Sequence, residues 1–182
     1  MENLITQFAS EVARGKIEIY NEFSLQHELG IFLRSNISDK KIQFERNVSF
    51  FGLDKIEYVK REIDISVFSN ITAPDAAIEL KYPRNGQHPE QMYSFCQDIE
   101  FMEQLKASGF VATYGVIFAE DHLFYEGNQE GIYGFFRGGR NLSGKITKPT
   151  GKKDTEVKIK GSYTVTWHPV VGNLKYTIIK AQ

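Results

Sequence analysis

Two short segments of the sequence, residues 61–67 and 77–82, carry the charged side chains best placed for chemistry. Apolar and polar residues alternate in both, which is the pattern of β-strands with one apolar face. Side chains two positions apart lie on the same face of a strand, so Glu79 and Lys81 share a surface. The pattern predicts a carboxylate and an ammonium side by side on one strand.

The residues between these segments bring a second carboxylate to the same place. Residues 70–74 contain Asn and Pro, which indicate a turn. A hairpin centred between positions 71 and 72 sets Asp64 opposite Glu79, since both are then equally far from its centre. Two carboxylates beside an ammonium can hold a hard divalent cation and activate a water molecule.

The arrangement Asp64…Glu79-Leu80-Lys81 resembles the PD-(D/E)XK, or restriction-endonuclease-like, nuclease superfamily, over about residues 20–118. The resemblance implies a magnesium-dependent hydrolase, with manganese as a substitute, that cleaves phosphodiester bonds, DNA being the expected substrate. Asp64, Glu79 and the backbone carbonyl of Leu80 would then bind the metal. Lys81 would orient the attacking water, help to deprotonate it, or neutralise the phosphate.

The chain departs from the family pattern at one position, because Ile63 stands where the family name has proline. A Pro-Asp pair does occur at Pro74 and Asp75. Asp75 lies only four residues before Glu79, however, so that no second strand would contribute a carboxylate. We therefore assign the metal-binding role to Asp64 and a turn role to Asp75.

Glu28 is a further candidate for catalysis and metal binding. It lies within a helix expected over about residues 21–34, on the flank of its apolar face. Many members of the resembled superfamily place a glutamate on the equivalent helix near the metal. The alternative is a boundary glutamate that pairs with His27 or Arg34.

The helix expected over residues 90–107 supplies the last candidate, Gln97. In some branches of the superfamily a glutamine or tyrosine on this helix touches the catalytic lysine or the nucleic acid. Asp98 is the second choice on this helix, and Gln91 and Tyr93 compete for the role of Gln97. The alternative is a solvated polar face.

The order of predicted elements is helix, three strands, helix, strand, as in the nuclease core. We expect an α/β fold with a restriction-endonuclease-like α-β-β-β-α-β core, in which helices flank a mixed sheet, followed by a C-terminal antiparallel β extension. The expected strands are residues 43–51, 61–67, 77–82 and 111–118 in the core, and 156–160, 163–167 and 175–179 beyond it. Residues 143–153 resemble a loop.

Length and composition indicate one domain of 182 residues, with the core at about 20–118 and the extension at 119–182. The single cysteine, Cys96, excludes an internal disulfide framework and a cysteine-rich metal site. The sequence contains no apolar run of membrane-spanning length and no signal-peptide pattern at its start, so we expect a cytoplasmic protein that does not enter membranes.

Charge is distributed unevenly along the chain. Residues 137–182 carry 10 Lys and Arg against 2 Asp and Glu, a net +8, which leaves −9 for residues 1–136 of a total of −1. A basic segment on an acidic body is compatible with a phosphate-binding face or with a solvated surface hairpin. The basic side chains that could follow a nucleic-acid backbone are Arg137, Arg140, Lys145, Lys148, Lys152 and Lys153.

The residues and the resemblance together predict a metal-dependent nuclease, with DNA as its partner. Cutting both strands of a duplex would require a homodimer or two binding events. The alternative is a catalytically silent nuclease-like fold that binds nucleic acid or protein.

Overall fold

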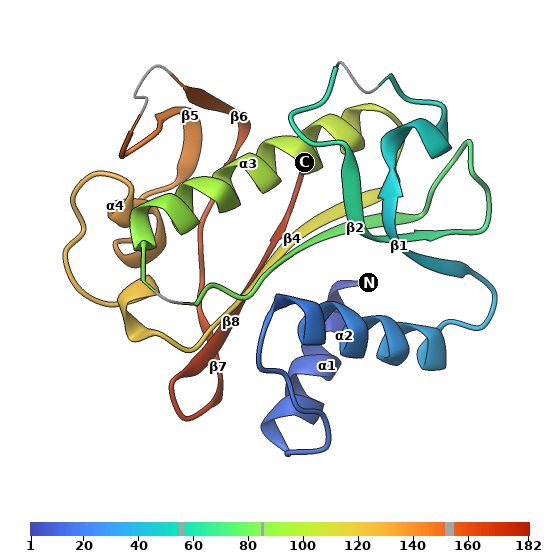
Figure 1. The fold of residues 1–182 in the computed structure, drawn as a ribbon, viewed down its shortest axis with the longest axis horizontal. Helices are drawn as coiled ribbons and strands as arrows, with labels where there is room; N and C mark the ends of the chain where they lie inside the picture. The colour runs from blue at the N-terminus through green and yellow to red at the C-terminus, as the bar shows by residue number, and fades with distance from the viewer. Residues whose placement is uncertain (55–56, 85, 152–154) are drawn as a thin grey trace.

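A six-stranded mixed β-sheet with helices on both faces organises the chain (Figure 1). The computed structural model describes residues 1–54, 57–84, 86–151 and 155–182. The elements are α1 (Glu2–Ala13), α2 (Glu22–Asn36), β1 (Lys41–Asn47), η1 (Val48–Phe51), β2 (Glu62–Phe68), β3 (Ala76–Lys81), α3 (His88–Ala107), β4 (Ala112–Ala119), η2 (His122–Phe124), α4 (Tyr133–Arg137), β5 (Leu142–Thr147), β6 (Glu156–Tyr163), β7 (His168–Val171) and β8 (Leu174–Lys180).

The strand order in the main sheet is β1-β2-β3-β4-β8-β7. The pair β3 and β4 is parallel, and α3 forms the crossover between these strands, as a parallel connection requires. The other pairs are antiparallel. The predicted order of helix, three strands, helix and strand is confirmed by α2, β1, β2, β3, α3 and β4.

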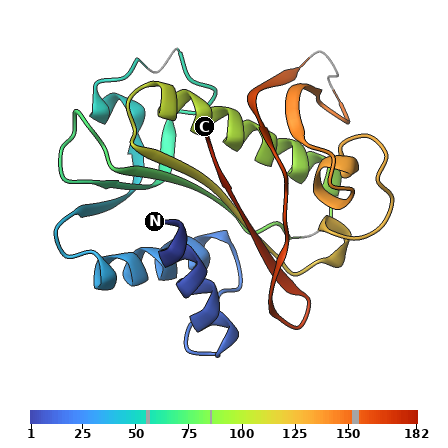
Figure 2. The same ribbon diagram turned by 180° about the vertical axis from the view of Figure 1, so that it is seen from behind.

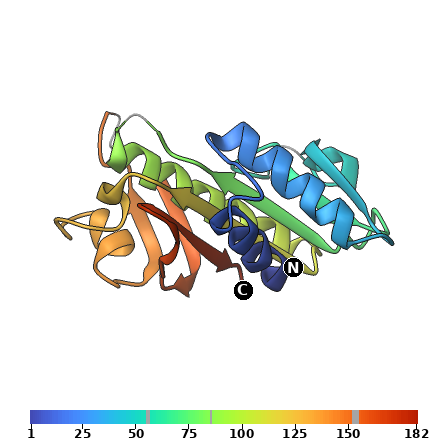
Figure 3. The ribbon, with the colours of Figure 1, turned by 90° about the horizontal axis from the view of Figure 1, so that it is seen from below.

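Helices α1 and α2 cover one face of the sheet and α3 covers the other (Figures 2 and 3). Successive side chains of β3 therefore pack in different hydrophobic clusters, on opposite faces of the sheet. Ile78 and Leu80 pack beneath α1 and α2, whereas Ala77 packs beneath α3. Glu79 and Lys81 share the face of Ala77, as the period of two requires, but this face is covered by a helix rather than open to solvent.

The C-terminal part of the chain is not an appendage to the core. β8 pairs with β4 and β7 with β8, so the main sheet is completed by the last strands of the chain. β5 and β6 form a separate hairpin on α3, where Glu103 accepts hydrogen bonds from the backbone N–H groups of Lys160 and Gly161. The expected loop at 143–153 was wrong where β5 lies. The separate strands expected at 156–160 and 163–167 are one strand, β6, which ends at Tyr163, and residues 164–167 form no strand. The strand expected at 43–51 ends at Asn47, just before η1 begins.

Helix α2 is fixed at its start and at its middle, and both constraints position the candidate site. Asn21 caps the helix by accepting a hydrogen bond from the Ser24 N–H at 2.7 Å, and Ser24 Oγ accepts from the Asn21 N–H, which completes a capping box. Gly30 lies directly against the ring of Phe44 on β1. Phe44 in turn lies beneath the guanidinium of Arg34.

No helix in the described ranges combines the length and apolarity needed to cross a membrane.

Replacing Gly30 with alanine should destabilise the protein, because the added methyl group would overlap the Phe44 ring. We expect Gly30→Ala to lower the free energy of unfolding by about 1–3 kcal/mol in urea denaturation. Ser35→Ala, on the exposed side of the same helix, should change it by less than about 0.5 kcal/mol. Equal stability of Gly30→Ala and the wild type would contradict the close approach of α2 to β1.

Candidate functional site

The hairpin of β2 and β3 has the predicted register. Its backbone pairing ends before Asp64 and Glu79. Ile65 pairs with Ile78, which places Asp64 opposite Glu79. Instead of continuing the backbone ladder, the Asp64 N–H donates to Glu79 Oε1 at 3.1 Å, and the Leu80 N–H donates to Asp64 Oδ2 at 2.7 Å. Each carboxylate therefore accepts a hydrogen bond from the opposite strand, which holds the two side chains together.

The neighbouring strand β1 is also distorted beside Asp64. Glu45 falls opposite Asp64 in the register but has a φ of 49°, a left-handed conformation that is rare for residues other than glycine. Gln26 on α2 donates from Nε2 to Glu45 Oε1 at 2.6 Å and to the Asp64 carbonyl at 2.9 Å. The backbone of Asp64 is thus held by side chains from α2 and β3.

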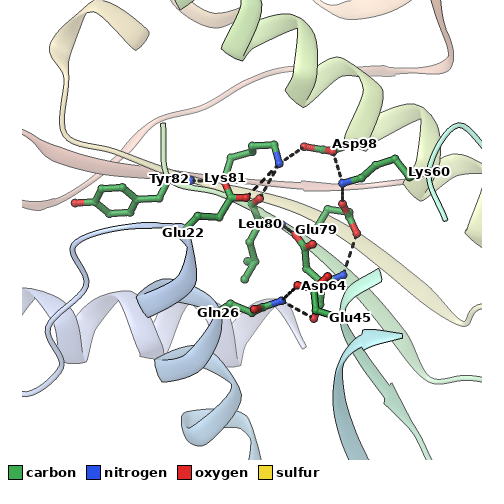
Figure 4. A network of polar contacts seen from close by, with 10 residues as sticks. All are labelled: Glu22, Gln26, Glu45, Lys60, Asp64, Glu79, Leu80, Lys81, Tyr82 and Asp98. Carbon is green, nitrogen blue, oxygen red and sulfur yellow. Dashed lines mark hydrogen bonds and ion pairs between the residues drawn. The ribbon is translucent and has the colours of Figure 1, made fainter. Parts of the chain in front are cut away.

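Lys60 closes the site on the side of α3 (Figure 4). Its ammonium group forms ion pairs with Glu79 Oε2 and, at 2.9 Å, with Asp98 Oδ1. Glu79 is completely buried, and the Asp98 side chain is 2% exposed. The Lys60 side chain itself is 29% exposed. It therefore lies between the two buried carboxylates and the solvent.

Lys81 lies on the other side of Asp98. Its Nζ is 3.4 Å from Asp98 Oδ2, 3.6 Å from Glu22 Oε1 on α2, and 3.3 Å from the carbonyl oxygen of Leu80, to which it donates. Glu22 also accepts a hydrogen bond from the Tyr82 N–H at 3.2 Å. The start of α2 therefore fixes both the ammonium of Lys81 and the backbone just beyond it.

Two hollows open onto Asp64 and share Glu45 as a wall. One, of about 290 Å³, is lined by Glu22, Phe23, Gln26, Glu45, Asp64 and Leu80. The other, of about 640 Å³, is lined by Glu45, Asn47, Val59, Lys60, Arg61, Glu62 and Asp64. Asp64 is therefore accessible from two directions, whereas Glu79 behind it is not.

Burial and neighbouring charge shift the protonation equilibria of the site. Burial raises the pKa of Asp64 from 3.8 to about 6, although Lys60 opposes the shift. Burial, followed by the charge of Asp64, raises the pKa of Glu79 well above its ordinary value. Burial disfavours the charged form of Lys60 and Lys81, but the surrounding carboxylates outweigh it and raise the pKa of both ammonium groups.

The site carries an excess of negative charge. Its carboxylates are Glu22, Glu45, Asp64, Glu79 and Asp98, and its cations are Lys60 and Lys81 (Figure 4), which gives a net −3 when all are ionised. Among the described residues, no three acidic, histidine or cysteine side chains converge as metal ligands. Mg²⁺ commonly uses only one or two carboxylates, with water and phosphate oxygens completing its shell. Asp64 and Glu79, with the Leu80 carbonyl beside them, fit that requirement.

The structure brings together Asp64, Glu79 and Lys81 but leaves Glu28 outside both hollows. Helix α2 reaches the site through Glu22 and Gln26, which are one turn apart. Glu28 follows Gln26 by two residues, which is about 200° around the helix, so it points to the opposite side. The expected role of Glu28 in catalysis and metal binding is therefore corrected, because Glu28 lies away from the two side chains of α2 that reach the site.

On α3, Asp98 rather than its neighbour Gln97 contacts the lysines. The side chain of Gln97 is half-buried and has no ion pair or side-chain hydrogen bond to the described residues. The sequence did not single out four residues of the site: Glu22, Gln26, Glu45 and Lys60. Lys60 lies just before the predicted strand. One signal was present in the sequence: an acidic residue at a buried helical position requires a partner, and Asp98 is such a residue.

Asp75 has the structural role that its place in the turn predicts. It accepts a hydrogen bond from the Ser69 N–H at 2.9 Å and pairs with Lys40. These contacts close the β2–β3 connection and keep Asp75 away from Glu79.

Several of the basic residues near the C-terminus have internal partners. Lys145 pairs with Glu156 at 3.2 Å, and Lys148 pairs with Glu90 on α3 at 3.4 Å. The guanidinium groups of Arg137 and Arg140 donate to backbone carbonyls and lie over the rings of Tyr133 and Phe135. Lys152 and Lys153 lie outside the described residues.

Comparison of the chain with protein-family models, curated protein sequences and solved structures finds no match. The interpretation of the site therefore depends on its own geometry.

The raised pKa of Asp64 predicts a pH-dependent stability of the metal-free protein. The folded state binds the Asp64 proton more tightly than the unfolded state, so the stability contributed by Asp64 falls as pH rises from about 4 to about 6. Asn cannot ionise. Asp64→Asn should therefore gain stability relative to the wild type over this window, by at most ~3 kcal/mol at neutral pH.

Urea denaturation of both proteins in a chelator, at several pH values, measures this difference. Glu62→Gln, which removes an exposed carboxylate from the same strand, is measured alongside as the matched control. A difference between Asp64→Asn and the wild type that does not change with pH would contradict a raised pKa at Asp64.

Proposed function

We propose that the protein is a magnesium-dependent nuclease of the PD-(D/E)XK type that hydrolyses phosphodiester bonds in DNA. The observation that carries the proposal is the position of Asp64 and Glu79 on facing strands, with Lys81 two residues further along. Asp64 lies 15 and 17 positions before Glu79 and Lys81, and the three side chains lie near one another on the two strands that the resemblance implies.

The topology around the site supports the same proposal. A restriction-endonuclease-like core requires a helix, a three-stranded meander, a crossover helix and a parallel strand. The elements α2, β1, β2, β3, α3 and β4 follow this order, and β3 and β4 are parallel. The residues of the site lie on β2 and β3 between the two helices, where such a core carries its chemistry.

Asp64 and Glu79 would hold the metal together with the backbone carbonyl of Leu80. A bound Mg²⁺ would stabilise negative charge developing on the phosphate and lower the pKa of a coordinated water. Asp64 faces both hollows, which gives a substrate phosphate access to the site. Glu79 lies behind it, fixed by the Asp64 N–H and by Lys60.

Lys81 would act as a donor and a positive charge rather than as a general base. Its pKa is raised by Asp98 and Glu22 against the effect of burial, so the ammonium form persists at neutral pH. An ammonium group has three hydrogen-bond donors and no acceptor. In this form Lys81 can orient the attacking water or hold a phosphate oxygen. Glu22 and Asp98 are positioning residues that direct its Nζ.

The acidic surroundings make DNA binding depend on the metal. Glu22 and Glu45 at the edge of the first hollow repel phosphate, and Asp64 between the hollows adds to this repulsion. A divalent cation reverses the local charge. Two copies of the chain, or two successive binding events, would be needed to cut both strands of a duplex.

Metal binding should depend on Asp64. Isothermal titration of the metal-free protein with Mn²⁺ should show at least about tenfold weaker binding by Asp64→Asn, since one of two carboxylate ligands is lost. Glu28→Gln is the matched control, because Glu28 lies on the opposite side of α2, and it should bind as the wild type does. Equal affinity of Asp64→Asn and the wild type would refute the assignment of Asp64.

Lys81 should be required for cleavage but not for metal binding. Lys81→Ala should lower the rate of cleavage of a fluorescent DNA duplex by about 100-fold or more in Mg²⁺, because a catalytic donor is lost. Its Mn²⁺ affinity should remain near that of the wild type, since an ammonium is not a metal ligand.

Lys41→Ala, which removes an exposed lysine from β1, should cleave normally. Circular dichroism checks the fold of both variants. Wild-type protein that binds DNA in Mg²⁺ but cleaves none would favour the silent nucleic-acid-binding fold instead.

A further inference from the structure

A second cation position lies beside the proposed metal site and is occupied by Lys60. The Lys60 ammonium contacts Glu79 Oε2 and lies 2.9 Å from Asp98 Oδ1. This position is distinct from that of the proposed metal, which lies toward Asp64 and the Leu80 carbonyl. Glu79 is common to both, because its Oε1 faces the Asp64 N–H and its Oε2 faces Lys60 (Figure 4).

The burial of this position requires a cation there. Glu79 is completely enclosed and the Asp98 side chain is 2% exposed, and two adjacent buried carboxylates without a counter-charge are strongly unfavourable. Asp98 Oδ2 is buried and makes no hydrogen bond within the described part of the chain; Lys81 Nζ is 3.4 Å away. Asp98 Oδ2 is thus ion-paired with Lys81 but accepts no hydrogen bond from the described residues.

Lys60 is well suited to remain in this position during catalysis. Its ammonium is a compact point charge with donors for both carboxylates. Its side chain is part of the wall of the 640 Å³ hollow onto which Asp64 also opens, so a phosphate in that hollow meets Lys60 directly. In two-metal sites a shared carboxylate commonly bridges the two ions, and the two ions together stabilise the attacking and leaving oxygens.

We propose that Lys60 takes the place of a second divalent cation, so that the site binds one metal at Asp64 and Glu79 and has a permanent ammonium at Glu79 and Asp98. This inference rests on the proposed metal-dependent function and specifies its stoichiometry. Lys60 then neutralises one side of the substrate phosphate while the single metal lies on the other. Removing the lysine side chain opens a second divalent-cation site between Glu79 and Asp98.

The Mn²⁺ stoichiometry of the purified protein tests this directly, by calorimetry and by electron paramagnetic resonance of free Mn²⁺. The wild type should bind one Mn²⁺ and Lys60→Ala should bind two. Lys60→Arg, which keeps the positive charge, should bind one. The double variant Lys60→Ala with Asp98→Asn, which removes both the cation and its second carboxylate, should return to one.

Each other result overturns the inference. Two Mn²⁺ ions in the wild type would mean that Lys60 replaces no metal. One ion in Lys60→Ala, bound more tightly than in the wild type, would mean that Lys60 only competes for the first site. One ion with unchanged affinity would mean that the Glu79–Asp98 position does not accept metal. If Lys60→Ala does not fold, Lys60→Ser, whose short side chain also leaves the position open, should likewise bind two ions, and one ion overturns the inference.

Failure of this inference is distinguishable from failure of the proposed function. A single Mn²⁺ that binds the wild type and is lost in Asp64→Asn supports the metal site whatever the result at Lys60. A wild type that binds no Mn²⁺ refutes the metal site and this inference together.

Discussion

The burial of one carboxylate, that of Glu79, is the constraint on which the local structure depends. A charged group that is completely enclosed must be paired and hydrogen-bonded, since its desolvation otherwise outweighs the gain from packing around it. The Asp64 N–H and the Lys60 ammonium meet this demand. The hairpin ladder opens at Asp64 because that N–H is directed to a side chain, and the chain before β2 is held over the sheet because Lys60 must reach Glu79.

The two helices that flank the sheet supply the remaining residues of the site. Because β3 and β4 are parallel, the chain must cross the sheet between them, and the crossover helix α3 places Asp98 above Glu79 and Lys81. On the opposite face, the capped start of α2 places Glu22 near Lys81, and Gln26 follows one turn later at Asp64. The site thus lies at one end of the β2–β3 pair, where α2 approaches from one face of the sheet and α3 from the other.

The sequence was sufficient to predict the parts of the site that local rules determine. Period-two alternation and one turn set Asp64 opposite Glu79, and both rules hold over a short stretch of chain. The rotation of α2 about its axis could not be determined in this way, because an apolar stripe does not say which of its flanks meets the sheet. The sequence therefore favours Glu28, whereas Gln26 contacts Asp64 in the structure. Lys60 contacts residues 19 and 38 positions away from an irregular segment, where no periodicity applies. β5 was missed because its pairing with β6 and packing on α3, rather than its composition, make it a strand.

The balance of charge in the site imposes an order on its ligands. Five carboxylates face two ammonium groups, so the site has a net negative charge when all of them are ionised, and a phosphate approaching it without a cation would be repelled. The positive charges already present do not remove this barrier, since Lys60 and Lys81 are both engaged by Asp98 and are partly buried. A divalent ion at Asp64 lowers the repulsion and also relieves the cost of keeping two carboxylates ionised side by side. Under the proposed function the metal would therefore bind before the phosphate, because the same ion that would assist hydrolysis would also make the cleft attractive to the substrate.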